Sequence, residues 1–423
     1  MTEPLFVGID FGTTNSAIAV ARGNGAPRLL PLPNPAAETG TSSTWRTVLY
    51  FEPGGRLSAG AEAIARYRET QGEGRLIQSI KSHLASASFA RTTVFGRRWT
   101  IEDMIAAFLR QIRQAVAAGI GELGSRCVIG RPVRYWGAET ADDDARAVSR
   151  MTTALASAGF TEVVFVAEPV AAASAYAARL TSAETIVVAD FGGGTTDFSV
   201  VRVGGHGPSE ILATGGVGIS GDAFDARIID ETIAPAFGKG SKYRDEMGAE
   251  ASVPAWVFNN LRRWHYLSFL KEPQTQRLLH RVVEGSLDPL CIERLRTVID
   301  DDLGLVLHQA VETAKLGISS AMQSELRIDH GVDLKKILLR QEFENWIAPD
   351  LAEIDDVLTK VLADASLAPN QVDRVFATGG ASLTPAVRTW LAKRFGAEKL
   401  VGGEELTSVA SGLAAQAQRF FGG

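Results

Sequence analysis

Cysteine is nearly absent from this 423-residue chain, which contains only Cys127 and Cys291. The two lie too far apart in sequence to form a CxxC or metal-binding pattern, so we expect buried free thiols in a reducing cytoplasm. Long apolar runs are also absent: stretches such as residues 186–189 are far shorter than the roughly 20 residues of a transmembrane helix. The N-terminal residues MTEPLFVG lack the basic region of a signal peptide. These absences predict a cytoplasmic protein that does not bind a membrane.

Blocks of like charge are missing too. The net charge is −6 at pH 7, and no run of five or six residues carries charges of one sign. A nucleic-acid partner or an anionic membrane surface is therefore not expected. The apolar fraction of 45% is ordinary for a globular protein, which excludes fibrous and wholly disordered chains. At about 100–200 residues per domain, the length predicts two to four domains with a cleft between domains.

A pattern that occurs twice indicates an internal duplication. Residues 7–20 read VGIDFGTTNSAIAV and residues 187–201 read VVADFGGGTTDFSVV. In both copies the glycines are followed by a second strand, at residues 16–21 and 198–203, which excludes the Rossmann fingerprint and the P-loop because both need a helix there. We therefore expect two β-hairpins in two domains built on one plan.

The tips of both hairpins have a composition suited to phosphate. Backbone N–H groups of a Gly-rich tip can form an anion nest. The hydroxyl groups that would add donors belong to Thr13, Thr14, Thr195 and Thr196. Asp10 and Asp190 at the strand ends would hold a hydrated Mg²⁺ that bridges the phosphates. A Gly-rich turn beside an aspartate is also common in purely structural hairpins, so the argument depends on there being two.

Helices and strands alternate between the two hairpins. Thr100 and Asp103 predict reciprocal capping at the start of a helix with apolar residues at helical spacing. Residues 126–129 and 162–166 are predicted strands, with a helix between them. Glu168 then lies where a strand meets a helix start, at the rim where α/β sheets bind ligands. An acid near a helix N-terminus is equally well explained by helix stability alone.

The segment over residues 226–311 is expected to be helical and rich in charge. Its expected core anchors are Trp256, Trp264, Leu267 and Phe269. A strand at residues 372–377 then leads into Gly379 and Gly380 and a helix at residues 385–395. This order places backbone N–H groups beside a ligand, although a glycine pair can equally end a strand.

Five motifs in order resemble the nucleotide-binding domain of the 70-kDa heat-shock chaperones, within the actin, hexokinase and heat-shock ATPase superfamily. They are IDFGTTNS, VFVAEPVAAASAY, ADFGGGTTDFS, FATGGASLTP and SVASGLAAQA, which begin at residues 9, 164, 189, 376 and 408. The segment GVGISGDAFD from residue 216 and the Ala314-Lys315 pair resemble further family motifs. The resemblance covers nearly the whole chain, which is similar in size to stand-alone, YegD-like members.

The resemblance implies an α/β fold with two lobes, each with a mixed sheet of ribonuclease-H-like topology, and ATP or ADP with Mg²⁺ in the cleft. The first lobe is expected to span residues 1–181 together with a closing helix at 408–423. The second is expected to span residues 182–407, including an enlarged helical subdomain at about 226–311. The implied activity is ATP hydrolysis at the γ-phosphate anhydride by a chaperone-like or regulatory protein.

The resemblance also implies roles for single residues. Those implied in catalysis are Asp10, Lys81, Glu168, Asp190, Thr195 and Asp197, with Asp10 and Asp190 holding Mg²⁺ through water. Those implied in binding phosphates and adenosine are Gly12, Thr13, Thr14, Asn15, Gly192, Gly193, Gly194, Thr195, Gly216, Glu312, Lys315, Ser319, Gly379, Gly380 and Ser382. Glu168 would position or deprotonate the attacking water. Lys81 matches the family's lysine through loose flanking residues, and the alternative is a solvated surface lysine.

Four features depart from the family's pattern. Leu316 and Leu383 stand where arginines are usual, and Thr140 stands where an arginine that senses the peptide domain is expected. Residues 226–311 are longer than usual, and the chain ends without an acidic-leucine linker or a peptide-binding domain. We therefore expect a protein partner or client of unknown identity to respond to the nucleotide state. Its expected docking surface contains Trp256, Trp264, Arg262 and Arg263, and a core position is the alternative for the two tryptophans.

Two other functions remain open. A small-molecule kinase on the same fold would need a further acid, for which residues 142–144 are candidates that a solvated helix face explains equally well. An actin-like scaffold protein would form filaments with ATP. Acceptor-dependent ADP release would indicate the kinase, and ATP-dependent sedimentation would indicate the filament.

Overall fold

The computed structural model describes residues 3–37, 39–70, 72–177, 180–205, 209–245, 247–262, 267, 270–401 and 408–422. The chain forms two compact units. The first comprises Met1–Gly218, Asp356–Ser382 and Arg388–Gly423, and the second comprises Ile219–Asp355 and Leu383–Val387. Both copies of the duplicated pattern lie in the first unit. The predicted lobe boundary between residues 181 and 182 falls inside this unit and stays a prediction.

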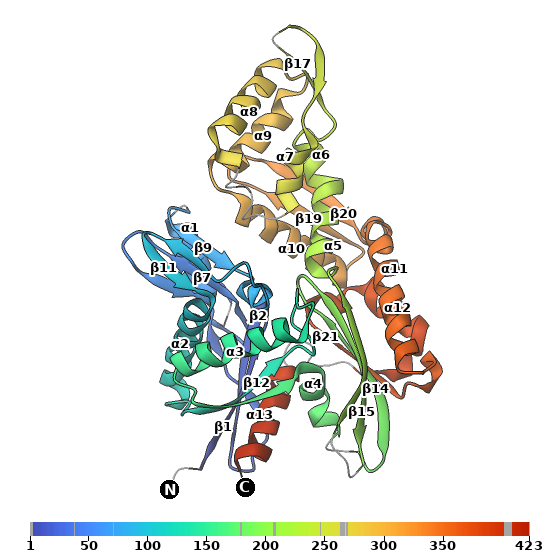
Figure 1. Cartoon of the computed structure of the whole chain (residues 1–423). Coiled ribbons are helices and arrows are strands. Elements are labelled where there is room, and N and C mark those ends of the chain that lie inside the picture. The colour runs from blue at the N-terminus through green and yellow to red at the C-terminus, as the bar shows by residue number, and fades with distance from the viewer. Residues whose placement is uncertain are drawn as a thin grey trace. The chain divides into compact units, whose positions relative to one another are not determined.

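Each copy of the pattern begins a mixed sheet of the first unit (Figure 1). The first sheet has the order β13-β12-β1-β2-β3, from β1 (Leu5–Phe11), β2 (Asn15–Arg22), β3 (Arg28–Leu29), β12 (Arg126–Arg131) and β13 (Glu162–Ala167). The second has the order β16-β15-β14-β21-β22, from β14 (Ala183–Phe191), β15 (Thr196–Gly204), β16 (Glu210–Val217), β21 (Arg374–Thr378) and β22 (Leu400–Val401). In both sheets the first two strands pair antiparallel, and the first pairs in parallel with the fourth. The shared order confirms the expected α/β fold with two mixed sheets.

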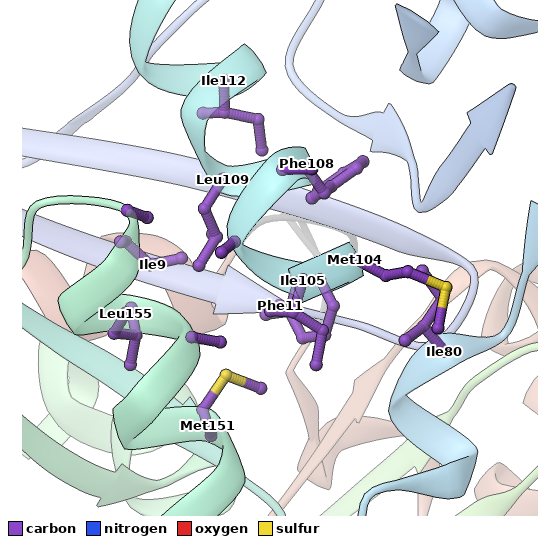
Figure 2. Close-up of a cluster of buried hydrophobic side chains, with 14 of the residues drawn as sticks. Ile9, Phe11, Ile80, Met104, Ile105, Phe108, Leu109, Ile112, Met151 and Leu155 are labelled. Carbon is purple, nitrogen blue, oxygen red and sulfur yellow. The ribbon is translucent and has the colours of Figure 1, made fainter. Parts of the chain in front are cut away.

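One face of the first sheet packs against two helices. Side chains alternate along a strand, so Ile9 and Phe11 of β1 point to the same side. Figure 2 shows them with Phe108 of α2 (Ile101–Ile120) and with Met151 and Leu155 of α3 (Ala141–Ser157). The rings of Phe11 and Phe108 meet edge to face, with centroids 5.8 Å apart. Burial of each such side chain contributes about 1.5–3 kcal/mol, so this core fixes the end of β1 that carries the candidate site.

The opposite face of β1 packs against α13 (Ser408–Phe421). Gly8 permits this close approach, because a Cβ atom at this position would lie 2.2 Å from the backbone nitrogen of Ala414. Leu413 shares a core with Val128 of the first sheet, Ile186 of the second, and residues of α4 (Glu168–Ala177). Helices α4 and α13 therefore bury apolar surface of both sheets.

Two helices of the first unit begin with capping boxes. The Thr100 hydroxyl accepts a hydrogen bond from the Asp103 backbone at 3.1 Å, and Asp103 accepts one from the Thr100 backbone at 3.1 Å, as predicted. Thr140 and Asp143 repeat this arrangement at the start of α3. The threonine at the expected arginine position therefore caps a helix.

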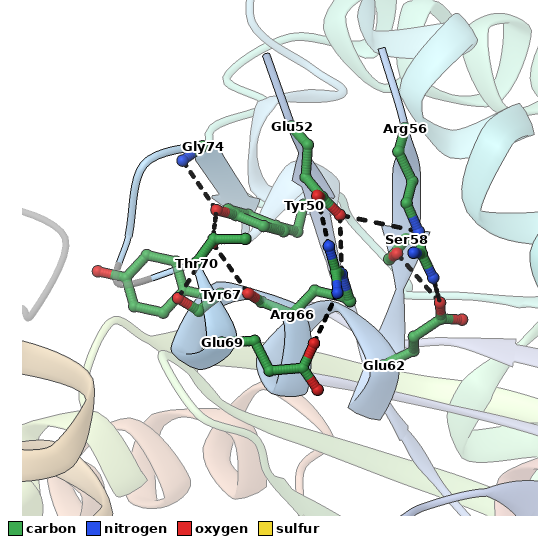
Figure 3. Close-up of polar contacts among 10 residues, drawn as sticks. All are labelled: Tyr50, Glu52, Arg56, Ser58, Glu62, Arg66, Tyr67, Glu69, Thr70 and Gly74. Carbon is green, nitrogen blue, oxygen red and sulfur yellow. Dashed lines mark hydrogen bonds and ion pairs between the residues drawn. The ribbon is translucent and has the colours of Figure 1, made fainter. Parts of the chain in front are cut away.

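A smaller sheet directly precedes the short helix that contains Lys81. Strand β7 (Val48–Phe51) pairs with β8 (Leu57–Ala59) and β9 (Arg75–Gln78), and α1 (Gly60–Glu69) packs on it. Figure 3 shows the polar network of this region, in which Arg66 donates to Glu52 at 2.9 and 2.7 Å. The Tyr50 hydroxyl bonds to Thr70 and accepts from the Gly74 backbone at 2.8 Å. This network anchors the sheet from which the 3-10 helix η1 (Ile80–His83) continues.

The remaining described elements complete the two units. Those of the first unit are β4 (Leu32–Pro33), β5 (Thr41–Ser42), β6 (Trp45–Arg46), β10 (Arg91–Val94), β11 (Arg97–Thr100), η5 (Pro369–Gln371) and η7 (Ala397–Lys399). Those of the second are α5 (Gly221–Ile228), η2 (Ile229–Ile233), α6 (Ala234–Ala236), β17 (Lys242–Arg244), β18 (Glu250–Ser252), α7 (Ala255–Asn259), η3 (Asn260–Arg262), α8 (Pro273–Gly285), α9 (Pro289–Asp300), α10 (Gly304–Ser320), β19 (Gln323–Ile328) and β20 (Leu334–Leu339). Three elements contribute residues to both units: α11 (Arg340–Asp364), η6 (Gly380–Leu383) and α12 (Pro385–Phe395).

Residues 226–311 are not wholly helical as expected, because β17 and β18 form a hairpin within them. Trp256 is 45% exposed, so its prediction as a core anchor is wrong, and nearby Phe258 is buried instead. Leu267 is buried as predicted. Arg263, Trp264 and Phe269 lie outside the described residues.

Of the two cysteines, Cys127 is buried as predicted. Cys291 is only half-buried, and its thiol donates to the Asp288 carboxylate at 3.1 Å, so the prediction for it is wrong. Within the described residues, no helix is both long enough and apolar enough to cross a membrane.

Candidate active site

Asp10 and Asp190 occupy equivalent positions in the two sheets. Asp10 is the next-to-last residue of β1, opposite Ala17 of β2. Asp190 is the next-to-last residue of β14, opposite Asp197 of β15. Thr378, the last residue of β21, donates its hydroxyl to Oδ1 of Asp190 at 2.9 Å. Each aspartate therefore lies at the carboxyl end of a strand, one step before a glycine-containing tip.

Lys81 and Glu168 form an ion pair in the first unit. Glu168 is the first residue of α4, directly after β13, as the sequence predicted. Lys81 Nζ lies 2.7 Å from Glu168 Oε1, and the two side chains are only 10% and 15% exposed. Lys81 is therefore not the solvated surface lysine that the sequence left as an alternative. Gly130 of β12 leaves room for the pair, because a Cβ atom there would lie 3.1 Å from Glu168 Cγ.

Acids outnumber bases around this ion pair. Burial and then the negative charge of Glu168 raise the pKa of Asp10 to about 7, while Lys81 acts in the opposite direction. Burial and Glu168 also raise the pKa of Asp190, which the bond from Thr378 partly opposes. Burial disfavours the charge of Lys81, but Glu168 and Asp10 hold its pKa well above its usual range. One lysine therefore does not balance the acids, and a further cation would be stabilised here.

Asp197 and Thr195 extend the acidic cluster along the second hairpin. The Thr195 hydroxyl donates to Asp197 Oδ2 at 3.0 Å. Desolvation and the charge of Asp190 raise the pKa of Asp197 to about 7, although its side chain is more open to solvent than that of Asp190. The second hairpin thus places a hydroxyl and two carboxylates at one end of the sheet.

The donor set of this cluster suits a hydrated divalent cation. Mg²⁺ keeps several waters and takes only one or two carboxylates. Among the described residues, no group of three or more His, Cys, Asp or Glu side chains is arranged to hold a metal ion directly. Asp10 and Asp190, which lack sufficient positive charge nearby, match an ion held through its waters.

The hairpin tips are tight turns. The Gly192 backbone donates to the Thr195 carbonyl at 2.9 Å, and a Cβ atom on Gly12 would lie 2.1 Å from the Asn15 carbonyl oxygen. The tip residues are half-buried, apart from the exposed Asn15; they are Gly12, Thr13, Thr14, Asn15, Gly192, Gly193, Gly194 and Thr195. Turns of this composition can form anion nests, so phosphate binding at the tips stays a prediction.

Gly216 and Gly379, which were predicted to contact nucleotide, pack closely against residues of the second sheet. Gly379 follows β21 with φ of +81°, and a Cβ atom there would lie 3.2 Å from Asp190 Oδ1. A Cβ atom on Gly216 would lie 2.2 Å from Asp197 Oδ1. The buried Ser382 donates its hydroxyl to the Gly379 carbonyl at 2.7 Å and so holds the turn that contains Gly380. A larger residue at position 216 would displace the Asp197 carboxylate, and one at position 379 would collide with the Phe191 carbonyl oxygen, 2.1 Å from the added Cβ atom.

Glu312, Lys315 and Ser319 lie on α10 in the second unit, whereas the acidic cluster belongs to the first. Within their own unit, Lys315 pairs with Asp225 of α5 at 2.7 Å, and both side chains are mostly buried. The Ser319 hydroxyl donates to the Lys315 carbonyl at 3.0 Å. Leu316 is 56% exposed on the same helix.

Two of the three acids proposed for a kinase have structural partners. Asp144 accepts from Arg131 at 2.5 Å and from the Tyr135 backbone at 3.0 Å. Asp143 caps α3 and pairs with Arg146 at 2.7 Å. These contacts explain both acids without a substrate hydroxyl.

Three residues of interest escaped the sequence analysis: Thr378, Asp225 and Tyr135. Thr378 and Asp225 lie within motifs that the sequence singled out, FATGG and GDAFD, and a polar residue beside a glycine turn was the available signal. Tyr135 follows Pro132 in RPVRYW, and nothing in that segment points to an acid elsewhere in the chain.

The fold and the cluster together define a mixed α/β protein with the architecture of the actin-like ATPase fold. A family model described as Hsp70 protein matches residues 65–246 and 299–422, which is well over half of the chain. The chain therefore belongs to the Hsp70 family, whose members are ATP-binding, chaperone-like ATPases. The match leaves out residues 1–64 and 247–298, and the latter fall within the segment that the sequence predicted to be enlarged.

Proposed function

We propose that this chain is a slow, Mg²⁺-dependent ATPase whose nucleotide state is sensed by a protein partner. The observation that carries the proposal is the buried Lys81–Glu168 ion pair, with a 2.7 Å contact, beside the acids Asp10 and Asp190. The tight Gly/Thr tips that follow both acids support it, because they can bind the phosphate oxygens of a nucleotide.

Glu168 orients the attacking water and accepts a proton from it. In this step the water oxygen forms a bond to the γ-phosphorus, the bond from that phosphorus to the bridging oxygen breaks, and ADP leaves with the electron pair. Lys81 fixes the direction of the Glu168 carboxylate and balances its charge. Thr195 and the tip amides hold the phosphates in place, which is most of the catalytic task in phosphoryl transfer.

Asp10 and Asp190 would hold a hydrated Mg²⁺. When bound, Mg²⁺ neutralises phosphate oxygens and the charge that develops on the leaving group. The raised pKa of Asp10 gives this role a physical basis, because bringing a cation near a partly buried carboxylate lowers the penalty for its negative charge.

Within the second unit, Glu312, Lys315 and Ser319 of α10 bind adenosine. The Lys315–Asp225 pair would hold α10 and α5 of the second unit in register for this contact. Leu316 and Leu383 provide apolar contacts to the base in place of arginine stacking, which removes about 0.5–2 kcal/mol of cation–π attraction.

The output is a conformational change read by another macromolecule, as in a YegD-like member of the family acting in the cytoplasm. Trp136 offers a route for such a change within the first unit. A Cβ atom on Gly218, just after β16, would lie 2.8 Å from Cη2 of Trp136, which follows β12. The indole follows a strand of the first sheet and therefore contacts the loop that leaves the second sheet.

The test compares two carboxylates of similar burial. Glu168→Gln should lower the single-turnover rate of ATP hydrolysis by about 10²–10⁴-fold, the usual effect of losing a general base. Glu52→Gln is the matched control, because Glu52 is 13% exposed and also pairs with a cation, Arg66, at 2.7 Å. It should leave the rate unchanged. Equal rates for both variants and the wild type would contradict the proposal.

A further inference from the structure

The phenol of Tyr135 is a buried polar group that the proposed mechanism does not use. Tyr135 is 2% exposed, and its hydroxyl has no hydrogen-bond partner among the described residues. An unsatisfied buried polar group costs about 1–3 kcal/mol, so such a group calls for a ligand or another explanation. By contrast, the buried hydroxyl of Tyr50 bonds to both Thr70 and Gly74 (Figure 3).

The backbone topology brings Tyr135 to the edge of the first sheet that carries Glu168. Arg131, the last residue of β12, pairs in parallel with Ala167, the last residue of β13. The chain then leaves the two strands in the same direction, towards Tyr135 in one case and directly into Glu168 in the other. The two residues therefore follow neighbouring strand ends.

Two contacts hold the Tyr135 ring in place. Its backbone N–H donates to Asp144 Oδ1 at 3.0 Å, and the Arg131 guanidinium lies 5.6 Å from the ring centroid. Arg131 is itself fixed by its ion pair with Asp144. The hydroxyl at the far end of the ring thus has a defined position set by the rest of the loop.

The charges of Lys81 and Glu168 both act on this hydroxyl. Burial raises the pKa of Tyr135 to about 12, an effect that Lys81 opposes and Glu168 reinforces. The phenol consequently keeps its proton at neutral pH and can both donate and accept a hydrogen bond. The hydroxyl makes no hydrogen bond to either member of the ion pair, and a water molecule between them would satisfy it.

We propose that Tyr135 is a positioning residue of the hydrolytic site, whose hydroxyl hydrogen-bonds to the water that Glu168 orients. This inference rests on the proposed ATPase function. With Glu168 and Tyr135 both bound to the water, its orientation is fixed in two directions and a lone pair stays directed at the γ-phosphorus. Tyr135 thereby helps to set the rate of hydrolysis without contributing to nucleotide affinity.

The experiment compares Tyr135→Phe with Tyr50→Phe in the full chain. Tyr135→Phe should slow single-turnover hydrolysis by about 10-fold and leave the Kd for ATP within about 2-fold of the wild-type value. The Tm should be unchanged or higher, because the substitution removes an unsatisfied buried hydroxyl. Tyr50→Phe should lower the Tm, because it breaks the bonds to Thr70 and Gly74, and leave the rate unchanged.

Each remaining outcome decides the question. A wild-type rate for Tyr135→Phe overturns the inference, and so does a loss of Tm or of ATP affinity that accounts for the slower rate. Glu168→Gln, measured alongside, separates the two claims. If Glu168→Gln abolishes hydrolysis while Tyr135→Phe has no effect, only the role of Tyr135 is wrong; if Glu168→Gln has no effect, the proposed function is wrong.

Discussion

Neutralising Asp10 should stabilise the folded protein while it destroys activity. In the absence of nucleotide and metal, burial and Glu168 raise the pKa of Asp10 from 3.8 to about 7. Since one pKa unit corresponds to about 1.4 kcal/mol, this shift of roughly three units sets an upper limit of about 4 kcal/mol on the stability gained when the charge of Asp10 is removed. The side chain is only partly buried, and its protonation is linked to that of nearby Asp190. We therefore expect Asp10→Asn to raise the free energy of unfolding by about 2–3 kcal/mol at pH 8.

The pH dependence of this gain independently tests whether Asp10→Asn stabilises the protein for the stated reason. The folded state binds the Asp10 proton more tightly than the unfolded state, so the wild type loses stability as pH rises from about 4 to about 7. Urea unfolding of both proteins between pH 4 and 8.5, without Mg²⁺ or nucleotide, measures the difference. The gain should be largest above pH 7 and shrink towards zero near pH 4. A gain that does not vary with pH, or a loss at pH 8, would refute the reasoning.

Three further perturbations have defined outcomes. Gly8→Ala should lower the free energy of unfolding in urea by at least about 1–3 kcal/mol, because its Cβ would lie 2.2 Å from the α13 backbone. Gly54→Ala, whose Cβ would lie in open space, should leave it almost unchanged. Introducing arginine at Leu316 and Leu383 should tighten ATP binding in calorimetry, and no gain would count against the proposed base contacts. ATP should change the fluorescence of the 55% exposed Trp136, so the signal change of the wild type should be lost in Trp136→Phe, and an unaltered change would assign it to another tryptophan.

Local chemistry explains why the sheets could be predicted. The alternating apolar residues and Gly/Thr tips of the two hairpins specify strands and turns within about 15 residues, and the capping pair Thr100 and Asp103 marks a helix start by itself. The position of Glu168 followed from the same kind of evidence, because a strand-to-helix junction is visible in the sequence.

Contacts between distant segments could not be predicted in this way. The 2.7 Å contact of Lys81 with Glu168 joins a 3-10 helix to the first residue of α4, 87 residues later, and only the packed fold brings them together. Tyr135 was missed for the same reason. Trp256 failed as a core anchor because hydrophobic character does not say which face of a short helix is covered, and Phe258 of that helix is buried instead.

The most direct test of the account is the single-turnover release of phosphate from Mg²⁺–ATP by the wild type, Lys81→Met, Glu168→Gln and the double variant. If the 2.7 Å ion pair is the centre of hydrolysis, each single substitution should slow the reaction by about 10²–10⁴-fold. The double variant should then be little slower than either single variant, because groups that act as a unit are not additive. Wild-type rates in both single variants, or no hydrolysis by the wild type, would contradict the account.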